Sequence, residues 1–232
     1  MSVSIPTTPP TPDPGQLILI DKPLRWTSFD VVNKLRYAGK FKKIGHAGTL
    51  DPLATGLLIL CTGRMTKQID QYQAQEKEYT GTFVLGKTTP SVDLETDFDA
   101  EFDTAGITPE QITEAARQLT GEITQVPPIY SAVRVGGERL YEKARRGETA
   151  DRIEGGIRSR LVTVSVFETD AGRFPDVDFR IVCAKGTYIR SLVRDLGLLL
   201  HNGAYLSALR RTRIGDFRVE DAQTIDEFIT NR

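Results

Sequence analysis

The stretch HAGTLDPLATG, residues 46–56, holds one carboxylate between residues that control the backbone. Gly48 and Gly56 supply turn freedom on either side, and Pro52 biases Asp51 toward an extended conformation. A carboxylate held rigidly among apolar neighbours suits a nucleophile or a general base. The alternative interpretation is an ordinary Asx-type turn, because Asp and Pro are both common turn residues.

Apolar runs and alternation on both sides of this stretch predict several strands. The run that follows it, 57–61, is continuously apolar and has the length of a buried strand, whereas 77–86 alternates with a period of two. Strands are predicted at 17–20, 57–61, 77–86, 161–168 and 177–184.

Threonines followed by helix-compatible patterns predict three helices. Thr27 is expected to cap a helix that ends at Gly39, and Thr187 is expected to cap one through residue 199. Thr108 precedes Pro109 and a capping-box glutamine, which predicts a helix to about residue 120. Strands and helices follow one another without a βαβ repeat, so the chain is predicted to be α+β around one large sheet.

A series of different short motifs follows along the chain between residues 15 and 215. The segment 45–56 fits the pattern Gly-His-x-Gly-x-Leu-Asp-Pro-x-Ala-x-Gly. The other motifs are residues 15–23, Thr27-Ser28, Lys77-Glu78-Tyr79, Pro127-Pro128-Ile129-Tyr130-Ser131-Ala132, Gly136 with Leu140-Tyr141-Ala144-Arg145-Gly147, Lys185-Gly186-Thr187-Tyr188-Ile189-Arg190, Gly203-Ala204 and Leu209-Arg210-Arg211-Thr212.

In order and spacing, this series resembles the TruB family of RNA pseudouridine synthases. The resemblance implies a pseudouridine synthase fold: one large mixed, mainly antiparallel sheet flanked by helices, with an inserted RNA-binding thumb at about 125–160. It implies a single catalytic domain over 15–232. The Ser-, Thr- and Pro-rich residues 1–14 are expected to form a disordered tail.

The implied reaction is isomerisation of uridine to pseudouridine in the T loop of tRNA, without a guide RNA. The target base would be flipped out of its stack before reaction. No cofactor and no metal are expected, since nothing is oxidised and the two histidines and two cysteines show no metal-ligand spacing. The expected partner is the T arm of tRNA, bound by a cytoplasmic monomer.

The resemblance assigns three catalytic residues. Asp51 would act at the ribose, Arg190 would pair with it, and Tyr79 would stack on the flipped base and serve proton transfer. An arginine in the first turn of a helix opposes the helix dipole, so a carboxylate partner would explain its presence. The alternatives are a solvent-facing arginine beside Asp195 and a core tyrosine.

The substrate-binding residues are also implied by resemblance. His46 is expected to act as a wedge in the space vacated by the flipped base, rather than as an acid or base. Lys22 is expected to support the wall of the site or to meet a phosphate. The remaining expected substrate-binding residues are Tyr188, Leu209, Thr49, Ile129, Tyr130, Arg145, Arg210 and Arg211.

Two departures from the family pattern stand out. Arg25 occupies a position after Pro23-Leu24 where the family usually has glycine, which makes the local turn uncertain. Many members carry a C-terminal PUA domain, and a chain of 232 residues is expected to be a short form without it. RNA affinity would then come from the catalytic domain.

Composition is that of an ordinary globular protein, with 39% hydrophobic residues and a net charge of −1. The charges are unevenly spread: five bases and no acid at 34–43, six bases and one acid at 185–213, and nine acids and one base at 91–122. The basic segments suit phosphate contacts, or are simply solvated helix faces.

Cys61 and Cys183 lie in apolar runs and are predicted to be buried free thiols. No apolar run in the sequence is long enough to span a membrane.

Three other functions were weighed against the isomerase. A non-catalytic tRNA-binding or folding chaperone on the same scaffold is the main alternative, although an intact Asp51, Tyr79 and Arg190 argue against lost catalysis. The guide-RNA-dependent branch of the superfamily carries the PUA domain and basic tails. A glycoside hydrolase usually needs a placed second carboxylate, and the motif contains none.

Overall fold

The computed structural model describes residues 14–149, 153 and 156–231, so the expected tail at 1–14 lies, except for Pro14, outside the described residues. The strands are β1 (Leu17–Lys22), β2 (Ile44–Ala47), β3 (Ala54–Thr62), β4 (Lys77–Leu85), β5 (Lys87–Thr88), β6 (Ala100–Glu101), β7 (Gly121–Gln125), β8 (Arg134–Val135), β9 (Glu138–Arg139), β10 (Arg160–Arg173), β11 (Asp176–Cys183), β12 (Ala204–Ile214) and β13 (Phe217–Arg218). The helices are α1 (Ser28–Gly39), α2 (Ile69–Ala74), α3 (Pro109–Gln118), α4 (Leu140–Arg145), α5 (Ile189–Leu199) and α6 (Ile225–Thr230), with 3-10 turns η1 (Gly63–Gln68) and η3 (Val219–Asp221).

Nine strands form one large sheet in the order β1-β3-β12-β4-β11-β10-β7, with β2 added to β3 and β13 to β12. β3 and β12 run parallel, and the other pairs in this sheet are antiparallel. This confirms the predicted α+β fold with one large mixed, mainly antiparallel sheet. The parallel pair matters for the site, because its register places Arg211 opposite Gly56, the last residue of the 46–56 stretch that contains Asp51.

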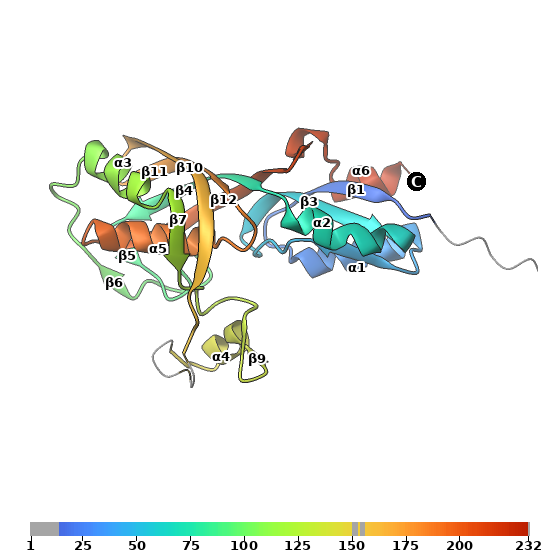
Figure 1. The fold of residues 1–232 in the computed structure, drawn as a ribbon, viewed down its shortest axis with the longest axis horizontal. Helices are drawn as coiled ribbons and strands as arrows, with labels where there is room; N and C mark the ends of the chain where they lie inside the picture. Colours follow the sequence, from blue (N-terminus) through green and yellow to red (C-terminus); the bar gives the residue numbers. More distant parts are fainter. Residues whose placement is uncertain (1–13, 150–152, 154–155, 232) are drawn as a thin grey trace, which may run out of the picture.

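Helices cover the two ends of the sheet separately, with α3 and α5 over one end and α1, α2 and α6 around the other (Figure 1). β3 is buried on both faces. Leu58 and Leu60 pack with α1 and α6, whereas Leu57 and Ile59 face the cluster that contains Ile69 of α2. This double burial is the physical reason for the continuous apolar run at 57–61.

The helix ends largely follow the capping signals in the sequence. Thr27 and Thr108 each form a complete capping box, with Asp30 and Gln111 respectively. The prediction for Thr187 was wrong, because α5 begins one residue later with Tyr188 as its N-cap. The Thr187 hydroxyl instead donates to the Ala184 carbonyl oxygen, 2.9 Å away, and closes the turn before the helix.

A small lobe containing β8, β9 and α4 projects away from the sheet (Figure 1). We call its described residues 126–149 the α4 lobe. They fall within the segment expected to form the thumb, which continues into residues 150–152 and 154–155, outside the described part of the chain.

Candidate active site

Asp51 lies in the loop between β2 and β3, and this loop is fixed from both sides. The Ser28 hydroxyl accepts a hydrogen bond from the Leu50 amide at 2.9 Å. The Asp51 carbonyl oxygen accepts one from the Ala54 amide at 3.0 Å, closing a turn around Pro52. The loop begins at Gly48, whose φ of +89° is one that residues with a side chain rarely adopt. Asp51 therefore sits on a rigid support.

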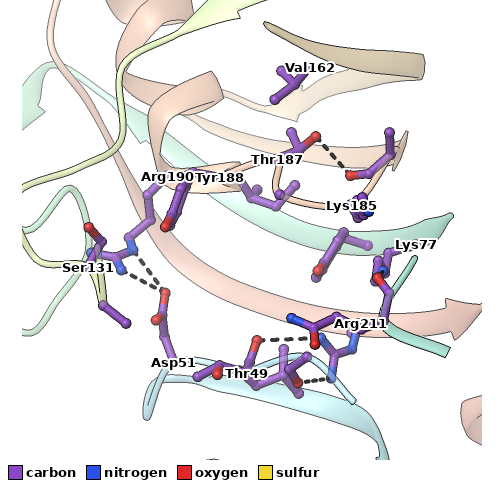
Figure 2. Close-up of a pocket in the computed structure, with 18 of the residues that line it drawn as sticks. Thr49, Asp51, Lys77, Ser131, Val162, Lys185, Thr187, Tyr188, Arg190 and Arg211 are labelled. Atoms are coloured by element: carbon purple, nitrogen blue, oxygen red, sulfur yellow. Dashed lines mark hydrogen bonds and ion pairs between the residues drawn. The ribbon is translucent and has the colours of Figure 1, made fainter. Parts of the chain in front are cut away.

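Arg190, in the first turn of α5, reaches across to this loop. Its guanidinium lies 2.9 Å from the Asp51 carboxylate through both Nε and Nη2, and its side chain is only 5% exposed (Figure 2). It also donates to the carbonyl oxygens of Ser91 at 2.9 Å and Tyr130 at 2.7 Å. One buried arginine thus joins the Asp51 loop, the segment after β5 and the α4 lobe.

The surroundings of Asp51 raise its pKa above the usual value for aspartate. Burial is the main cause; the Arg190 cation opposes the rise, and the negative charge of Asp93 adds to it. A carboxylate with a raised pKa binds a proton more strongly, and so is a better base, than a free aspartate.

Asp51 and Arg190 open onto a cavity of about 760 Å³ whose walls come from both ends of the sheet. Tyr79, Tyr188, Leu209 and Thr49 also line it. Burial raises the pKa of the Tyr79 hydroxyl, so this group stays protonated. With Arg211, the structure thus brings seven of the sequence-predicted site residues, the catalytic three among them, to one cavity large enough for a nucleobase.

Two predicted substrate-binding cations are instead buried. Lys22 is 0% exposed, and its ammonium donates to the carbonyl oxygens of Trp26 at 2.6 Å and Pro23 at 3.0 Å. It supports the wall beneath the loop and offers no surface to a phosphate. Arg211 is 1% exposed and is bonded to backbone carbonyls, although it borders the cavity. Of the two alternatives for Lys22, the structure fits support of the wall and not contact with a phosphate.

Two other predicted cations are exposed but already paired. Arg210 lies 2.6 Å from Asp21, and Arg145 lies 2.8 Å from Glu95. Each would have to exchange its carboxylate for a phosphate to bind RNA. His46 lies at the end of β2; burial and the nearby Arg211 cation lower the pKa of its imidazole. Ile129 and Tyr130 lie on the α4 lobe.

Asp93 is a site residue that the sequence reasoning missed. Its carboxylate is 3.7 Å from the Arg190 guanidinium, and its side chain is 8% exposed. Nothing local distinguishes it from the other acids of the 91–122 segment, and only burial beside Arg190 does so. Gln125, also missed, accepts a hydrogen bond from the Tyr188 amide at 2.7 Å and donates to the Tyr188 carbonyl oxygen at 3.1 Å.

The described residues also bear on the predictions about thiols, metal ligands and membrane spans. Cys61 and Cys183 are buried free thiols, as predicted. Within the described ranges, no group of three His, Cys, Asp or Glu side chains is placed to hold a metal ion. Among the same residues, no helix is long and apolar enough to cross a membrane.

Known proteins similar to this chain agree in family. Residues 36–189 match the model of the TruB family pseudouridylate synthase N-terminal domain, and residues 190–231 match that of the tRNA pseudouridylate synthase B C-terminal domain. The tRNA pseudouridine synthase B of Flavobacterium johnsoniae is 53% identical over 92% of this chain and 94% of its own length. That of Corynebacterium efficiens is 46% identical over 90% of this chain and 71% of its own length.

Among solved structures, a chain of a Cbf5-Nop10-Gar1 complex superposes with a TM-score of 0.70 at 30% identity. The match covers 92% of this chain and 53% of that one. The fold, the cavity and these relatives lead to one conclusion: the chain belongs to the TruB family of tRNA pseudouridine synthases, which are isomerases.

Proposed function

We propose that this protein converts a uridine in the T loop of tRNA to pseudouridine, without a guide RNA, and that Asp51 is the catalyst. The observation that carries the proposal is the Asp51–Arg190 ion pair in the wall of a cavity of about 760 Å³, which is large enough to admit a nucleobase. The name tRNA pseudouridine synthase B, shared by relatives that match most of this chain, supports tRNA as the substrate.

The reaction breaks the bond between C1′ and N1 of uridine, turns the uracil, and joins C5 to the same C1′. C5 then loses its proton to solvent and N1 takes one up, so that the product is an isomer of the substrate. The uridine must leave its stack to enter the cavity. In the proposed reaction Tyr79 stacks on the base and Asp51 acts at the ribose as nucleophile or base; their position in the lining of the cavity supports these roles. Arg190 would aim the carboxylate, and the cavity walls would keep the uracil beside the sugar while it turns.

RNA would be held at the mouth of the cavity by the α4 lobe acting as a thumb. Tyr130 lies on this lobe, and its carbonyl oxygen accepts a hydrogen bond from Arg190, so Arg190 links the lobe to the Asp51–Arg190 ion pair. His46 would fill the space that the flipped base leaves. We further propose a monomer, with residues 15–232 as one catalytic domain, acting in the cytoplasm, where two buried free thiols are stable.

The test is tritium release from C5 of uridine in an unmodified tRNA transcript, comparing wild type with Asp51→Asn. Wild type should release tritium, and Asp51→Asn should lose at least about 10³-fold in rate while its tRNA affinity changes little. A labelled transcript in which cytidine replaces the target uridine of the T loop should release no tritium when it is treated with the wild-type enzyme. Appreciable product from Asp51→Asn would reject the aspartate as catalyst.

The same assay separates the isomerase from a tRNA-binding or folding chaperone on this scaffold. Tight tRNA binding by wild type without tritium release would favour the chaperone. Affinity should also fall steeply with salt if phosphate contacts dominate. A dissociation constant that is flat between about 50 and 200 mM salt would contradict that mode of binding.

A further inference from the structure

Arg211 makes an unusual set of contacts directly beneath the Asp51 loop. Its side chain is 1% exposed, and its guanidinium donates to the backbone carbonyl oxygens of three residues, besides a hydrogen bond with the Tyr79 hydroxyl. Nε donates to Leu57 at 2.8 Å, Nη2 to Gly48 at 3.1 Å, and Nη1 approaches Thr49 at 3.5 Å. Gly48 and Thr49 precede Asp51, whereas Leu57 follows it. One planar group therefore spans both ends of the loop.

The charge of Arg211 is not neutralised nearby. Among the described residues, no carboxylate lies within ion-pair distance of it. Burial, with the Arg211 cation adding to it, lowers the pKa of Lys77 to about 8. A buried, unpaired cation is costly, and an apolar side chain of similar volume is often no less stable at such a position. Stability alone is therefore a poor explanation for this arginine.

Arg211 and Arg190 act on different parts of the same residue. Arg190 contacts the Asp51 carboxylate (Figure 2), whereas Arg211 contacts the backbone before it, at Gly48, and after it, at Leu57. Among the described hydrogen bonds and ion pairs, none joins Arg211 to the Asp51 carboxylate itself. Arg211 can therefore act on the carboxylate through the position of the loop.

We propose that Arg211 is a positioning residue for the isomerisation, which holds the two ends of the Asp51 loop together and so places the carboxylate against the ribose. The proposal rests on the proposed function of Asp51. It requires the forked geometry of arginine, because a lysine ammonium cannot reach Leu57 on one side and Gly48 on the other in the same way. Misplacing a reacting group by about 1 Å can cost about 10²-fold in rate.

The experiment is a single-turnover tritium-release assay with enzyme in excess over tRNA, applied to wild type, Arg211→Lys and Arg180→Lys. Arg180 is the matched control, because it lies in the same sheet but pairs with Glu78 at 2.7 Å and is 42% exposed. We expect Arg211→Lys to lower the rate constant about 10- to 100-fold, with tRNA affinity and reaction amplitude within about twofold of wild type. Arg180→Lys should match wild type.

The rate constant at saturating enzyme separates positioning from a folding defect, since an unfolded fraction lowers the concentration of active enzyme and lowers the amplitude once that concentration falls below that of the tRNA, but does not change the saturating rate constant. A wild-type rate constant for Arg211→Lys, or a loss of amplitude alone, would overturn the proposal. If Arg211→Lys does not fold, Arg211→Gln, which buries no charge, takes its place with the same expected loss of rate. A shifted acid limb in the pH–rate profile would also overturn it, because that limb should keep its pH while the plateau falls.

The assay also distinguishes this proposal from the proposed function. Wild type without turnover, or an active Asp51→Asn, would refute the role of Asp51. An active wild type, an inactive Asp51→Asn and a fully active Arg211→Lys would refute only the role of Arg211.

Discussion

The Asp51 loop and the α4 lobe face the same cavity but are held to different extents. The loop is contacted by the side chains of Arg190 and Arg211, which are 5% and 1% exposed. The start of the lobe is bonded to α5 through the carbonyl oxygens of Val126 and Tyr130. The rest of the lobe is joined to the described body of the chain by the exposed ion pair of Arg145 with Glu95, whose arginine side chain is 62% exposed.

The difference teaches which part of the site can move at little cost. Exposed ion pairs contribute about 0–1 kcal/mol each and weaken with salt, and a phosphate can replace their carboxylates. Breaking a buried, hydrogen-bonded cation away from its partners costs several times more. The comparison therefore predicts that the lobe can be repositioned at a smaller cost in free energy than the Asp51 loop.

The largest expected effect comes from adding one methyl group to each region. Gly56 has a φ of +103°, and a Cβ there would lie 2.3 Å from the backbone oxygen of Arg211, so Gly56→Ala should cost at least about 3 kcal/mol. Gly147 in the lobe has a φ of +84° but open space around it, so Gly147→Ala should cost about 1 kcal/mol locally. Thermal unfolding monitored by circular dichroism would measure both. Equal losses of thermal stability in the two variants would contradict the difference between the Asp51 loop and the α4 lobe.

The second prediction concerns pH. Because only the carboxylate form of Asp51 is active and its pKa is raised, the single-turnover rate should fall as pH drops, beginning above the pH range of an ordinary aspartate. Below that pKa the rate should fall about tenfold per pH unit. Tritium release across a pH series would show the limb. A limb at about pH 4 or lower would mean that the loop is more open to water than its packing indicates.

The third prediction tests the attachment of the lobe. Glu95→Gln removes the carboxylate that pairs with Arg145 and should raise the rate of limited proteolysis within 126–149 a few-fold, since this pair contributes no more than about 1 kcal/mol. Global thermal stability should stay within about 2 °C of wild type. Asp97→Asn, at an exposed acid of the same segment, is the control and should leave proteolysis unchanged. Equal protection in Glu95→Gln and wild type would show that other contacts hold the lobe.

The smallest expected effect lies at the edge of the loop. Arg25 has a φ of +65°, and its amide donates to the Pro52 carbonyl oxygen at 2.7 Å. Arg25→Gly relieves a strain of about 1–2 kcal/mol and loses part of that to chain entropy, so it should stabilise by about 0.5–1 kcal/mol. A rise in melting temperature of about 1–4 °C would fit. A fall would show that the arginine side chain itself supports the turn.

The backbone conformation of Arg25 also answers the question, left open by the sequence, of whether the local turn is kept without glycine. The family pattern has glycine at this position, and the arginine here keeps the left-handed backbone that glycine favours. The turn is therefore retained with a strained residue. Its hydrogen bond to Pro52 ties the segment after β1 to the Asp51 loop.

Sequence patterns predicted most of the local structure because their causes are local. Thr27 and Thr108 cap helices through contacts three residues away, and the alternation at 77–86 reflects one strand with two faces. The prediction for Thr187 failed by one residue, since a hydroxyl can close the preceding turn as readily as it caps a helix. Asp93 was missed because its burial beside Arg190 depends on a contact across 97 residues of chain.

The sequence by itself determined the fold class, the family and the candidate catalyst, since a rigid Asp-Pro turn between glycines, an apolar strand and ordered motifs are local records of structure. Only the tertiary structure decided what the cations do. The sequence does not distinguish Arg190, Arg210 and Arg211 from one another. In the structure Arg190 pairs with Asp51, Arg210 pairs with Asp21, and Arg211 lies buried beneath the Asp51 loop. The parallel pairing of β3 with β12 places Arg211 there, and no local pattern encodes which side of a strand meets a loop from far along the chain.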